Sequence, residues 1–259
     1  MKRYRWLLGC CLFLSIGMLW AADEPDLRML QQKAAQSRDM EGYVGVCKYL
    51  YQTEENPELL LLYADSIHQL ATKSKKPEQL VEYYIWASEG NFIKGDFQQG
   101  YALKRKAIAL AEKAGLKFAI SQSCCDMGYY CNVDARYDSA RYYFRKGLEA
   151  GEDLSEAGEA CRTMLTNYAS SFLFEGKTDS ALVYTIRASE RSAADKDTAM
   201  LIENLNQLGT IYRRKKDLEN CIANFEQALH LCELRGNHNA VAFIYGNIAT
   251  AYCDWNRPG

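Results

Sequence analysis

The chain has 259 residues, of which 48% are hydrophobic, 25% are charged and only four are proline. This composition suits a mostly helical, well-packed protein. The formal net charge is −2, and acidic and basic residues are interleaved without a long run of either sign. Such a balance argues against a partner held mainly by charge, such as a nucleic acid or an anionic membrane surface.

The N-terminus has the parts of a secretory signal peptide. Lys2, Arg3 and Arg5 precede an apolar run from Trp6 to Ala22, which ends in two small residues. We therefore expect residues 1–22 to be a signal peptide and the chain to be exported, with the bacterial periplasm as the expected compartment. The alternative is an uncleaved membrane anchor that leaves the rest of the chain outside the cytoplasm, because the run is near the lower limit of a membrane span.

Residues 23–76 are expected to form helices that make a degenerate repeat or an N-terminal cap. Apolar residues recur at helical spacing within residues 23–37 and 41–53. Asn56 followed by Pro57 is typical of a helix start, with an N-cap and a proline in the first turn, and this helix is expected to run to about Thr72. Pro77 opens the next helix in the same way.

From residue 77 to residue 259 small residues recur with a period of about 40. Small anchor residues of the first helix of each pair stand at intervals of 40, 41, 40 and 40 residues, at Ser88, Gly128, Ala169, Gly209 and Ala249. Nineteen residues after the first four anchors come Ala107, Gly147, Ala188 and Ala228. Small residues in register let two helices approach closely, so an array of helix pairs is expected. The last pair is expected to be incomplete, which would leave Ile248 and Tyr252 partly uncovered.

The stretch Leu205–Ala228 carries the fullest pattern. A large residue, Leu-Gly and Tyr on one helix precede a small residue, Phe and Ala on the next, at Leu205, Leu208, Gly209, Tyr212, Cys221, Phe225 and Ala228. This pattern resembles the tetratricopeptide repeat, whose usual period is about 34 residues. The resemblance implies an all-α fold, a right-handed solenoid of antiparallel helix pairs, similar to exported bacterial tetratricopeptide proteins or to the input domains of sensors.

The resemblance also implies a concave groove, lined by the first helices, that binds a protein or a peptide. The candidates for contact are Asn167, Gln207, Thr210, Arg213, Arg214 and Asn247. Asn and Gln side chains both donate and accept hydrogen bonds, as an extended peptide backbone requires, and arginine can bind a ligand carboxylate. The alternatives are structural roles for the amides and a solvated basic helix end for the arginines.

The sequence offers little support for catalysis. The three histidines, His68, His230 and His238, fall on different predicted helices, and neither a phosphate-binding glycine loop nor an HExxH motif is present. We expect no enzyme activity, no cofactor and no metal. Eight of the ten cysteines follow residue 22 without zinc-site spacing; we interpret them mainly as buried small hydrophobes, with disulfides among some of them as the alternative.

Together these features favour an exported, non-enzymatic repeat scaffold that binds a protein or peptide. The alternative is the extracytoplasmic sensor portion of a longer membrane-bound signalling or transcriptional regulator. Either role is compatible with oligomerisation, and neither involves nucleic acid bound by this chain.

Overall fold

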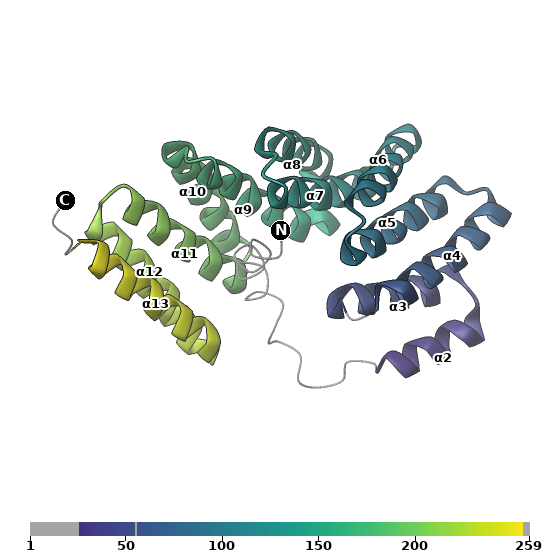
Figure 1. The fold of residues 1–259 in the computed structure, drawn as a ribbon, viewed down its shortest axis with the longest axis horizontal. Coiled ribbons are helices and arrows are strands. Elements are labelled where there is room, and N and C mark those ends of the chain that lie inside the picture. Colours follow the sequence, from purple (N-terminus) through teal and green to yellow (C-terminus); the bar gives the residue numbers. More distant parts are fainter. Residues whose placement is uncertain (1–25, 55, 256–259) are drawn as a thin grey trace. The chain divides into compact units, whose positions relative to one another are not determined.

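The structure is a computed structural model that describes residues 26–54 and 56–255 (Figure 1). The expected signal peptide, residues 1–22, lies outside the described residues. Within the described ranges all regular structure is helical, with twelve α-helices and one short 3-10 helix. None of the helices in these ranges combines the length and the apolar character that crossing a membrane requires.

The helices follow one another along the chain with short connections. Their bounds are α2 (Leu27–Ser37), α3 (Met40–Thr53), α4 (Pro57–Ser74), α5 (Pro77–Lys94), α6 (Phe97–Ala114), α7 (Lys117–Val133), α8 (Tyr137–Gly151), η1 (Ser155–Ala157), α9 (Gly158–Phe174), α10 (Thr178–Ala194), α11 (Thr198–Arg214), α12 (Leu218–Leu234) and α13 (His238–Trp255).

Polar residues cap several of the helices, and Asn56 does so as the sequence predicts. Asn56 Oδ1 accepts a hydrogen bond from the Leu59 main-chain N at 2.9 Å, and Pro57 follows in the first turn. Asp96 and Asp217 each accept from the main-chain N of the third residue after them, at 3.1 Å. These bonds satisfy N–H groups that the first turn of a helix leaves free.

The turns inside the helix pairs keep one backbone conformation although their residues differ. Gly95 and Gly176 have φ values of 91° and 83°, and the equivalent Ala135 and Lys216 have 56° and 58°. The left-handed conformation costs a non-glycine residue about 1 kcal/mol. The repeat architecture therefore holds this turn even where glycine is absent.

The chain divides into two compact units, and their boundaries fall within α7 and α8. The described residues of the N-terminal unit are 26–54, 56–127 and 146–157; its core includes Leu50, Leu60 and Ile67, and α2 to α6 pack in chain order. The described residues of the C-terminal unit are 128–145 and 158–255. In this unit α9 to α13 pack in chain order, and α11 also contacts α9 and α13.

Two anchor glycines explain why the helices of a pair lie so close. A Cβ atom added to Gly128 would lie 2.4 Å from the Phe144 ring, and one added to Gly209 would lie 2.6 Å from the Phe225 ring. Both rings are fully buried. The predicted pairing of a small anchor on the first helix with an aromatic ring on the second is confirmed in these two repeats.

The last described helix, α13, is buried along one side only, through Ala240, Ile244 and Ala251. Ala249, the fifth anchor, is exposed, Ile248 is half-buried and Tyr252 is 47% exposed. One side of α13 is therefore exposed within the described residues.

None of the cysteines between residues 26 and 255 is joined in a disulfide. Seven are buried, and Cys253 on α13 is exposed. Burial raises the pKa of the Cys47 and Cys124 thiols to about 12. Seven of the eight thus behave as the small hydrophobes that the sequence predicts.

Candidate functional site

The six residues that the sequence predicts as partner contacts all lie in the C-terminal unit. Asn167 is on α9, Asn247 is on α13, and the other four are on α11. These are the first helices of three successive pairs, and α11 contacts both of the others. We term the polar residues on these helices the polar face: Asn167, Ser170, Glu203, Asn206, Gln207, Thr210 and Asn247.

Charged contacts fix the start of α11 next to α9. Asp197 caps α11 by accepting a hydrogen bond from the Met200 main-chain N at 3.1 Å. Arg162 on α9 donates from Nε to Asp197 at 2.9 Å and from Nη1 to Asp195 at 3.0 Å. Hydrogen bonds from Arg191 and Arg162 hold the pKa of Asp195 below its usual value. The turn before α11 is therefore held by ion pairs with Arg162.

A buried amide fixes the rotation of α11. Asn204 is fully buried; its Oδ1 accepts from the Thr166 hydroxyl at 2.9 Å, and its Nδ2 donates to the Ser192 hydroxyl at 3.1 Å. With Asn204 locked toward α9 and α10, the side of α11 that carries Glu203, Gln207 and Thr210 has a defined direction.

Gln207 links three helices. Its Nε2 donates to the Ser170 hydroxyl on α9 at 2.6 Å, and its Oε1 accepts from the Thr185 hydroxyl on α10 at 3.1 Å. Both ends of the amide are therefore engaged within the protein. Gln207 holds the polar face together whether or not a ligand is bound.

Thr210 and Asn247 meet at Asn206. The Thr210 hydroxyl donates to the Asn206 main-chain oxygen at 3.1 Å, one turn back on α11. Asn247 Nδ2 donates to Asn206 Oδ1 at 2.8 Å and so links α13 to α11. The second N–H and the carbonyl oxygen of the Asn247 amide remain available for further hydrogen bonds.

Asn167 is bound only through its backbone. Its main-chain oxygen accepts from Asn132 Nδ2 at 3.0 Å. The side-chain amide is half-buried and makes no hydrogen bond within the described part of the chain. Of the predicted amides it therefore has the largest unused hydrogen-bonding capacity.

The two predicted arginines are both engaged within the unit. Arg213 Nη1 donates to Asp254 on α13 at 2.8 Å, and Arg214 Nη1 donates to the Leu173 main-chain oxygen on α9 at 2.7 Å. Asp254 is about half exposed, so a ligand carboxylate can compete for Arg213. Arg214 satisfies a helix-end carbonyl, which is a structural task.

Glu203 belongs to the polar face and was missed by the sequence analysis. It stands one turn before Gln207 and two turns before Thr210, so helical spacing places all three on one side of α11. Burial raises the pKa of Glu203 to about 8, and the charge of Asp197 adds to the shift. At neutral pH its carboxyl is mostly protonated and, like an amide, both donates and accepts. The i, i+4, i+7 spacing could have indicated that Glu203 lies on the polar face. The raised pKa of Glu203 could not be predicted in this way, because it depends on burial.

The N-terminal unit contains a buried ionic cluster. Lys104 on α6 is fully buried, where the repeat pattern predicts an aromatic residue. It pairs with Glu89 on α5 and, at 2.9 Å, with Asp126 on α7. Burial alone lowers the pKa of Lys104, but the charges of Asp126 and Glu89 outweigh it and hold that pKa above its ordinary value. Lys104 therefore stays charged and spans three helices.

Groupings suited to catalysis are sparse. Within the described ranges no group of three or more His, Cys, Asp and Glu side chains is arranged to hold a metal ion. His68 stacks on Tyr83 with ring centroids 4.3 Å apart, and His230 and His238 are exposed on α12 and α13.

The comparisons with known proteins agree with this architecture. A tetratricopeptide repeat family model matches residues 198–259, which include α11, α12 and α13. Residues 198–259 are thus similar to tetratricopeptide repeats. The match includes the stretch Leu205–Ala228 and confirms the resemblance inferred from its residues. A comparison with curated protein sequences found no match.

Solved structures with the same kind of tetratricopeptide-like helical repeat are similar along most of the chain. The apo form of RapI is 10% identical with a TM-score of 0.69, over 97% of this chain and 70% of that chain. Aspartyl phosphate phosphatase F from Bacillus subtilis is 15% identical with a TM-score of 0.60, over 97% and 68%. PlcR from Bacillus thuringiensis, solved with the peptide PapR7 and DNA, is 13% identical with a TM-score of 0.54, over 94% and 96%. At these identities the likeness shows the fold alone.

One rule connects the tetratricopeptide pattern with the polar face. The tetratricopeptide pattern expects an aromatic residue on the second helix, 16 positions after the anchor. Where this residue is polar instead, its side chain bonds to the side chain that stands two positions before the next anchor. Lys104 binds Asp126, and Thr185 binds Gln207. Where the aromatic is kept, as Phe144 and Phe225, the corresponding residues are Asn167 and Asn247. Within the described residues, neither of these amides is hydrogen-bonded by the second helix of the preceding pair.

A hollow lies at the end of the C-terminal unit. Its volume is about 810 Å³, and its lining comprises residues 216–219, 222, 223 and 226 from the start of α12 with Tyr252 and Trp255 from α13. Because Tyr252 and Trp255 are about half exposed, the hollow is an open surface of mixed character rather than an enclosed ligand cavity.

Proposed function

We propose that the chain is an exported, non-enzymatic tetratricopeptide scaffold that binds an extended peptide, or an extended segment of another protein, along the polar face. The observation that carries the proposal is the pair Asn167 and Asn247. Both amides stand at the same position of their repeats on the same face, and both keep unused donors and acceptors. An extended backbone offers a matching series of C=O and N–H groups.

The electrostatics of the polar face favour a peptide backbone over a strongly charged ligand. Between Asn167 and Asn247 the face contributes amides, hydroxyls and Glu203, whose raised pKa leaves it mostly uncharged at pH 7. Tetratricopeptide arrays use extended surfaces of this kind. PlcR, which shares the fold, was solved with a bound peptide.

The test uses peptides selected on the wild-type chain from a phage-displayed random library. Asn167→Ala combined with Asn247→Ala should weaken the selected peptides by about tenfold or more, because each amide supplies about 0.5–1.5 kcal/mol of net hydrogen bonding. Asn224→Ala is the matched control: this amide on α12 bonds only to its own helix, at the Asn220 main-chain oxygen. Peptides that bind the double variant as tightly as the wild type would place the binding surface elsewhere.

Export rests on the basic and apolar N-terminal residues, and its expected destination is the bacterial periplasm. Fractionation of the producing cell with N-terminal sequencing of the recovered protein tests it. A chain that starts near residue 23 in the periplasmic fraction supports export, whereas an intact Met1 in the cytoplasm contradicts it.

A second candidate is the extracytoplasmic sensor portion of a longer membrane-bound regulator. It is favoured by the likeness to PlcR, which was solved with both a peptide and DNA. Reading the gene beyond the codon for Gly259 separates the candidates. A membrane span followed by a cytoplasmic module would establish the sensor, and an immediate stop codon would exclude it.

A further inference from the structure

Glu203 on α11 is a carboxyl group for which the described part of the chain supplies no partner. It is half-buried, and neither a hydrogen bond nor an ion pair joins it to another described residue. The influences on it are its burial and the negative charge of Asp197, and both disfavour the ionised form. A positive charge brought close to Glu203 would relieve this unfavourable environment.

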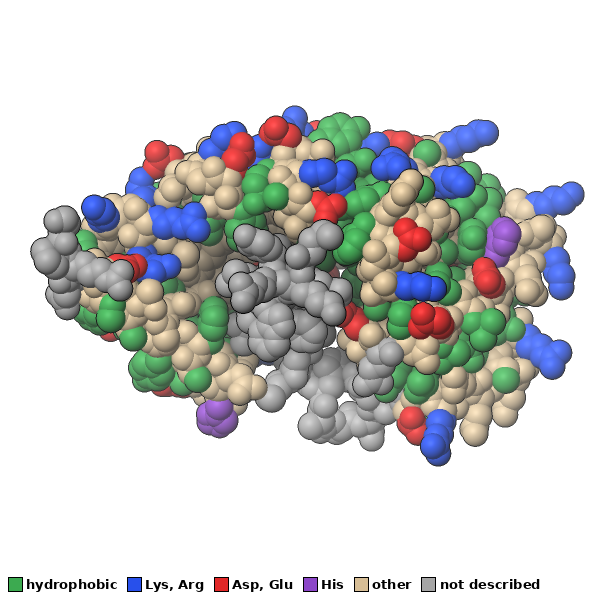
Figure 2. Space-filling model, in the orientation of Figure 1, with side chains coloured by type: hydrophobic (Ala, Val, Ile, Leu, Met, Phe, Trp, Pro, Cys, Tyr) green, Lys and Arg blue, Asp and Glu red, His purple; other side chains and the backbone are tan. Residues whose placement is uncertain are grey.

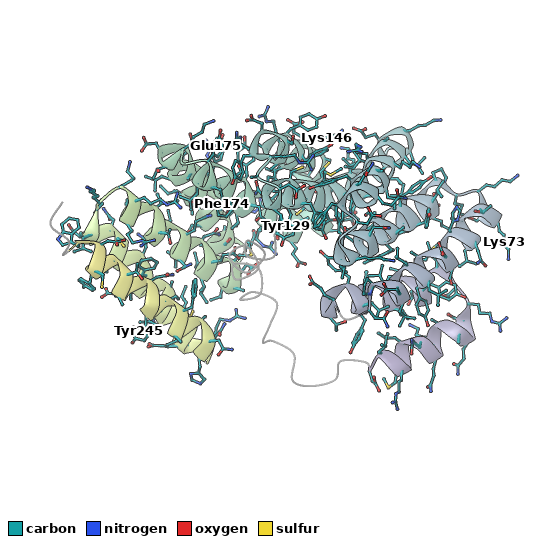
Figure 3. The ribbon with its side chains drawn as sticks, viewed as in Figure 1. Lys73, Tyr129, Lys146, Phe174, Glu175 and Tyr245 are labelled. Atoms are coloured by element: carbon teal, nitrogen blue, oxygen red, sulfur yellow. The ribbon has the colours of Figure 1, made fainter. Side chains whose placement is uncertain are left out.

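Four other carboxylates, at or beside the ends of α9, α11 and α13, are paired with cations of the chain. They are Asp195 and Asp197 with Arg162, Glu175 with Arg141, and Asp254 with Arg213. Glu175 is labelled in Figure 3, at the turn between α9 and α10. Exposed carboxylates such as Glu233 on α12 need no such cation, because water solvates them. Glu203 is neither exposed nor paired.

Neighbouring residues fix the direction of Glu203. Asn204, the next residue, is fully buried and bonds to α9 and α10. Gln207, one turn later, bonds to Ser170 on α9. With these two residues held, helical spacing places Glu203 on the side of α11 that carries Gln207 and Thr210. Its carboxyl group therefore belongs to the surface on which the candidate amides lie.

The arginines next to the start of α11 are already paired. Arg162 on α9 and Arg191 on α10 both bind acidic residues of the turn before α11, and Lys196 in that turn is exposed. On α13 no charged side chain lies between Asn239 and Cys253, and Figure 2 shows hydrophobic side chains at the surface over this helix, at the lower left. α12 packs on the side of α11 that carries the anchor glycine. A ligand can supply the charge that Glu203 lacks.

We propose that Glu203 selects the peptide: its carboxylate pairs with one positively charged group of the ligand, on a lysine or arginine side chain or at the N-terminus of the peptide. This selection rests on the peptide-binding function proposed above and adds a charge requirement to it. The other residues of the polar face are amides and hydroxyls, so a single positive charge is recognised rather than a basic run. An acidic residue at the same place would meet a second carboxyl group and be rejected.

Binding a cation changes the protonation of Glu203. Burial and the charge of Asp197 raise its pKa to about 8, so in the free protein at pH 7 the carboxyl group mostly keeps its proton. When a cation binds, the carboxyl O–H bond breaks, the proton passes to the buffer, and the remaining carboxylate pairs with the ligand. Complete ionisation at pH 7 releases about 0.9 proton per bound peptide. The Glu203→Gln variant has no such proton to release.

Isothermal titration calorimetry of the full chain tests this pairing with the peptides selected on the wild type. Each basic residue of a selected peptide is exchanged for methionine in turn, and a further version carries an acetylated N-terminus, which separates the two sources of positive charge. Loss of the recognised charge should weaken binding to the wild type by about tenfold or more, as expected for a charge-assisted hydrogen bond. In Glu203→Gln the same exchange should change the affinity by less than about twofold.

Proton release is measured at pH 7 from the binding heats in two buffers of different ionisation enthalpy. The wild type should release nearly one proton per peptide and Glu203→Gln none. Glu233→Gln is the matched control, because it removes an exposed carboxylate from α12; affinity and proton release should both stay unchanged. Circular dichroism checks that each variant folds, and Glu203→Met, also without charge, replaces Glu203→Gln if that variant does not.

Three outcomes would overturn the selection by charge. They are selected peptides that bind equally well without any positive charge, binding without proton release, and equal losses in the wild type and Glu203→Gln. If such peptides still lose affinity when Asn167→Ala and Asn247→Ala are combined, peptide binding on the polar face stands and the role of Glu203 alone fails. Peptides insensitive to all of these substitutions, or a library without binders, would refute both proposals.

Discussion

Replacing Gly209 by alanine measures how closely α11 and α12 must approach. The added Cβ atom would lie 2.6 Å from the Phe225 ring, whereas ordinary contacts begin near 3.4 Å. Phe225 is fully buried, so its ring has no solvent to move into. Such overpacking costs about 1–3 kcal/mol, against a gain of about 1 kcal/mol from the better helix propensity of alanine.

Gly45→Ala is the control that isolates helix propensity. Gly45 also lies inside a helix, α3, but a Cβ atom there would meet nothing within 4 Å. We expect this variant to be more stable than the wild type by about 0.5–1 kcal/mol. Relative to it, Gly209→Ala should be less stable by about 1–3 kcal/mol. For a chain of this size the difference lowers the melting temperature by about 2–4 °C for each kcal/mol.

The assay is thermal and urea unfolding followed by circular dichroism. Phe225→Leu in the Gly209→Ala background should recover part of the loss, because the smaller side chain leaves room for the Cβ atom. The expected coupling between the two substitutions is about 1 kcal/mol. If Gly209→Ala and Gly45→Ala stabilise the chain equally, α11 and α12 do not pack closely enough for Gly209 to be required.

Four further predictions concern polar and thiol groups. Lys104→Met should cost about 3–5 kcal/mol in urea unfolding, because it removes the buried positive charge that pairs with Glu89 and Asp126. A cost below about 1 kcal/mol would contradict the buried cluster. Raising the pH from 5 to 8 should destabilise the wild type by about 3 kcal/mol more than Glu203→Gln. The raised pKa of Glu203, about 8, lets the folded state keep a proton that the unfolded state releases. Equal pH profiles of the two chains would refute this. Gln207→Ala should cost about 1 kcal/mol more than Asn167→Ala in the same assay, since only Gln207 bridges helices; equal costs would contradict the bridge. Of the cysteines between residues 26 and 255, Cys253 alone should react quickly with a thiol reagent in the native state; rapid labelling of a second would show that a buried thiol is accessible.

The repeat architecture could be predicted from sequence because it depends on residues that repeat. Small anchors recur every 40 or 41 residues, and glycine at two of them leaves room for the aromatic ring that follows. Asn56, Asp96 and Asp217 act as helix caps through bonds to residues only three positions away. Local signals of this kind need no knowledge of the rest of the fold.

The polar contacts could be predicted only in part, because their partners lie far away in sequence. Lys104 stands where the pattern expects an aromatic residue. Its role as an ion-pair partner depends on Asp126, which is 22 positions later in the sequence. The sequence predicts Gln207 as a partner contact, but it does not predict the hydrogen bonds of its amide to Ser170 and Thr185, which lie on two other helices. The raised pKa of Glu203 depends on the burial of its carboxyl group, and this burial cannot be predicted from the sequence of the helix.

The two deviations from the aromatic pattern divide the polar positions into two kinds. Lys104 and Thr185 are polar residues of second helices, and each bonds to the residue two before the next anchor. Asp126 and Gln207 are therefore bonded within the protein. Phe144 and Phe225 offer no such bond, and Asn167 and Asn247 are left to satisfy their amides elsewhere. Asn247 has done so in part at Asn206, and Asn167 has not.

A half-buried amide without a partner gains more from a ligand than one already satisfied, because an unmade hydrogen bond costs about 1–3 kcal/mol. The repeats that keep their aromatic residue are therefore the ones from which a bound peptide would draw its affinity.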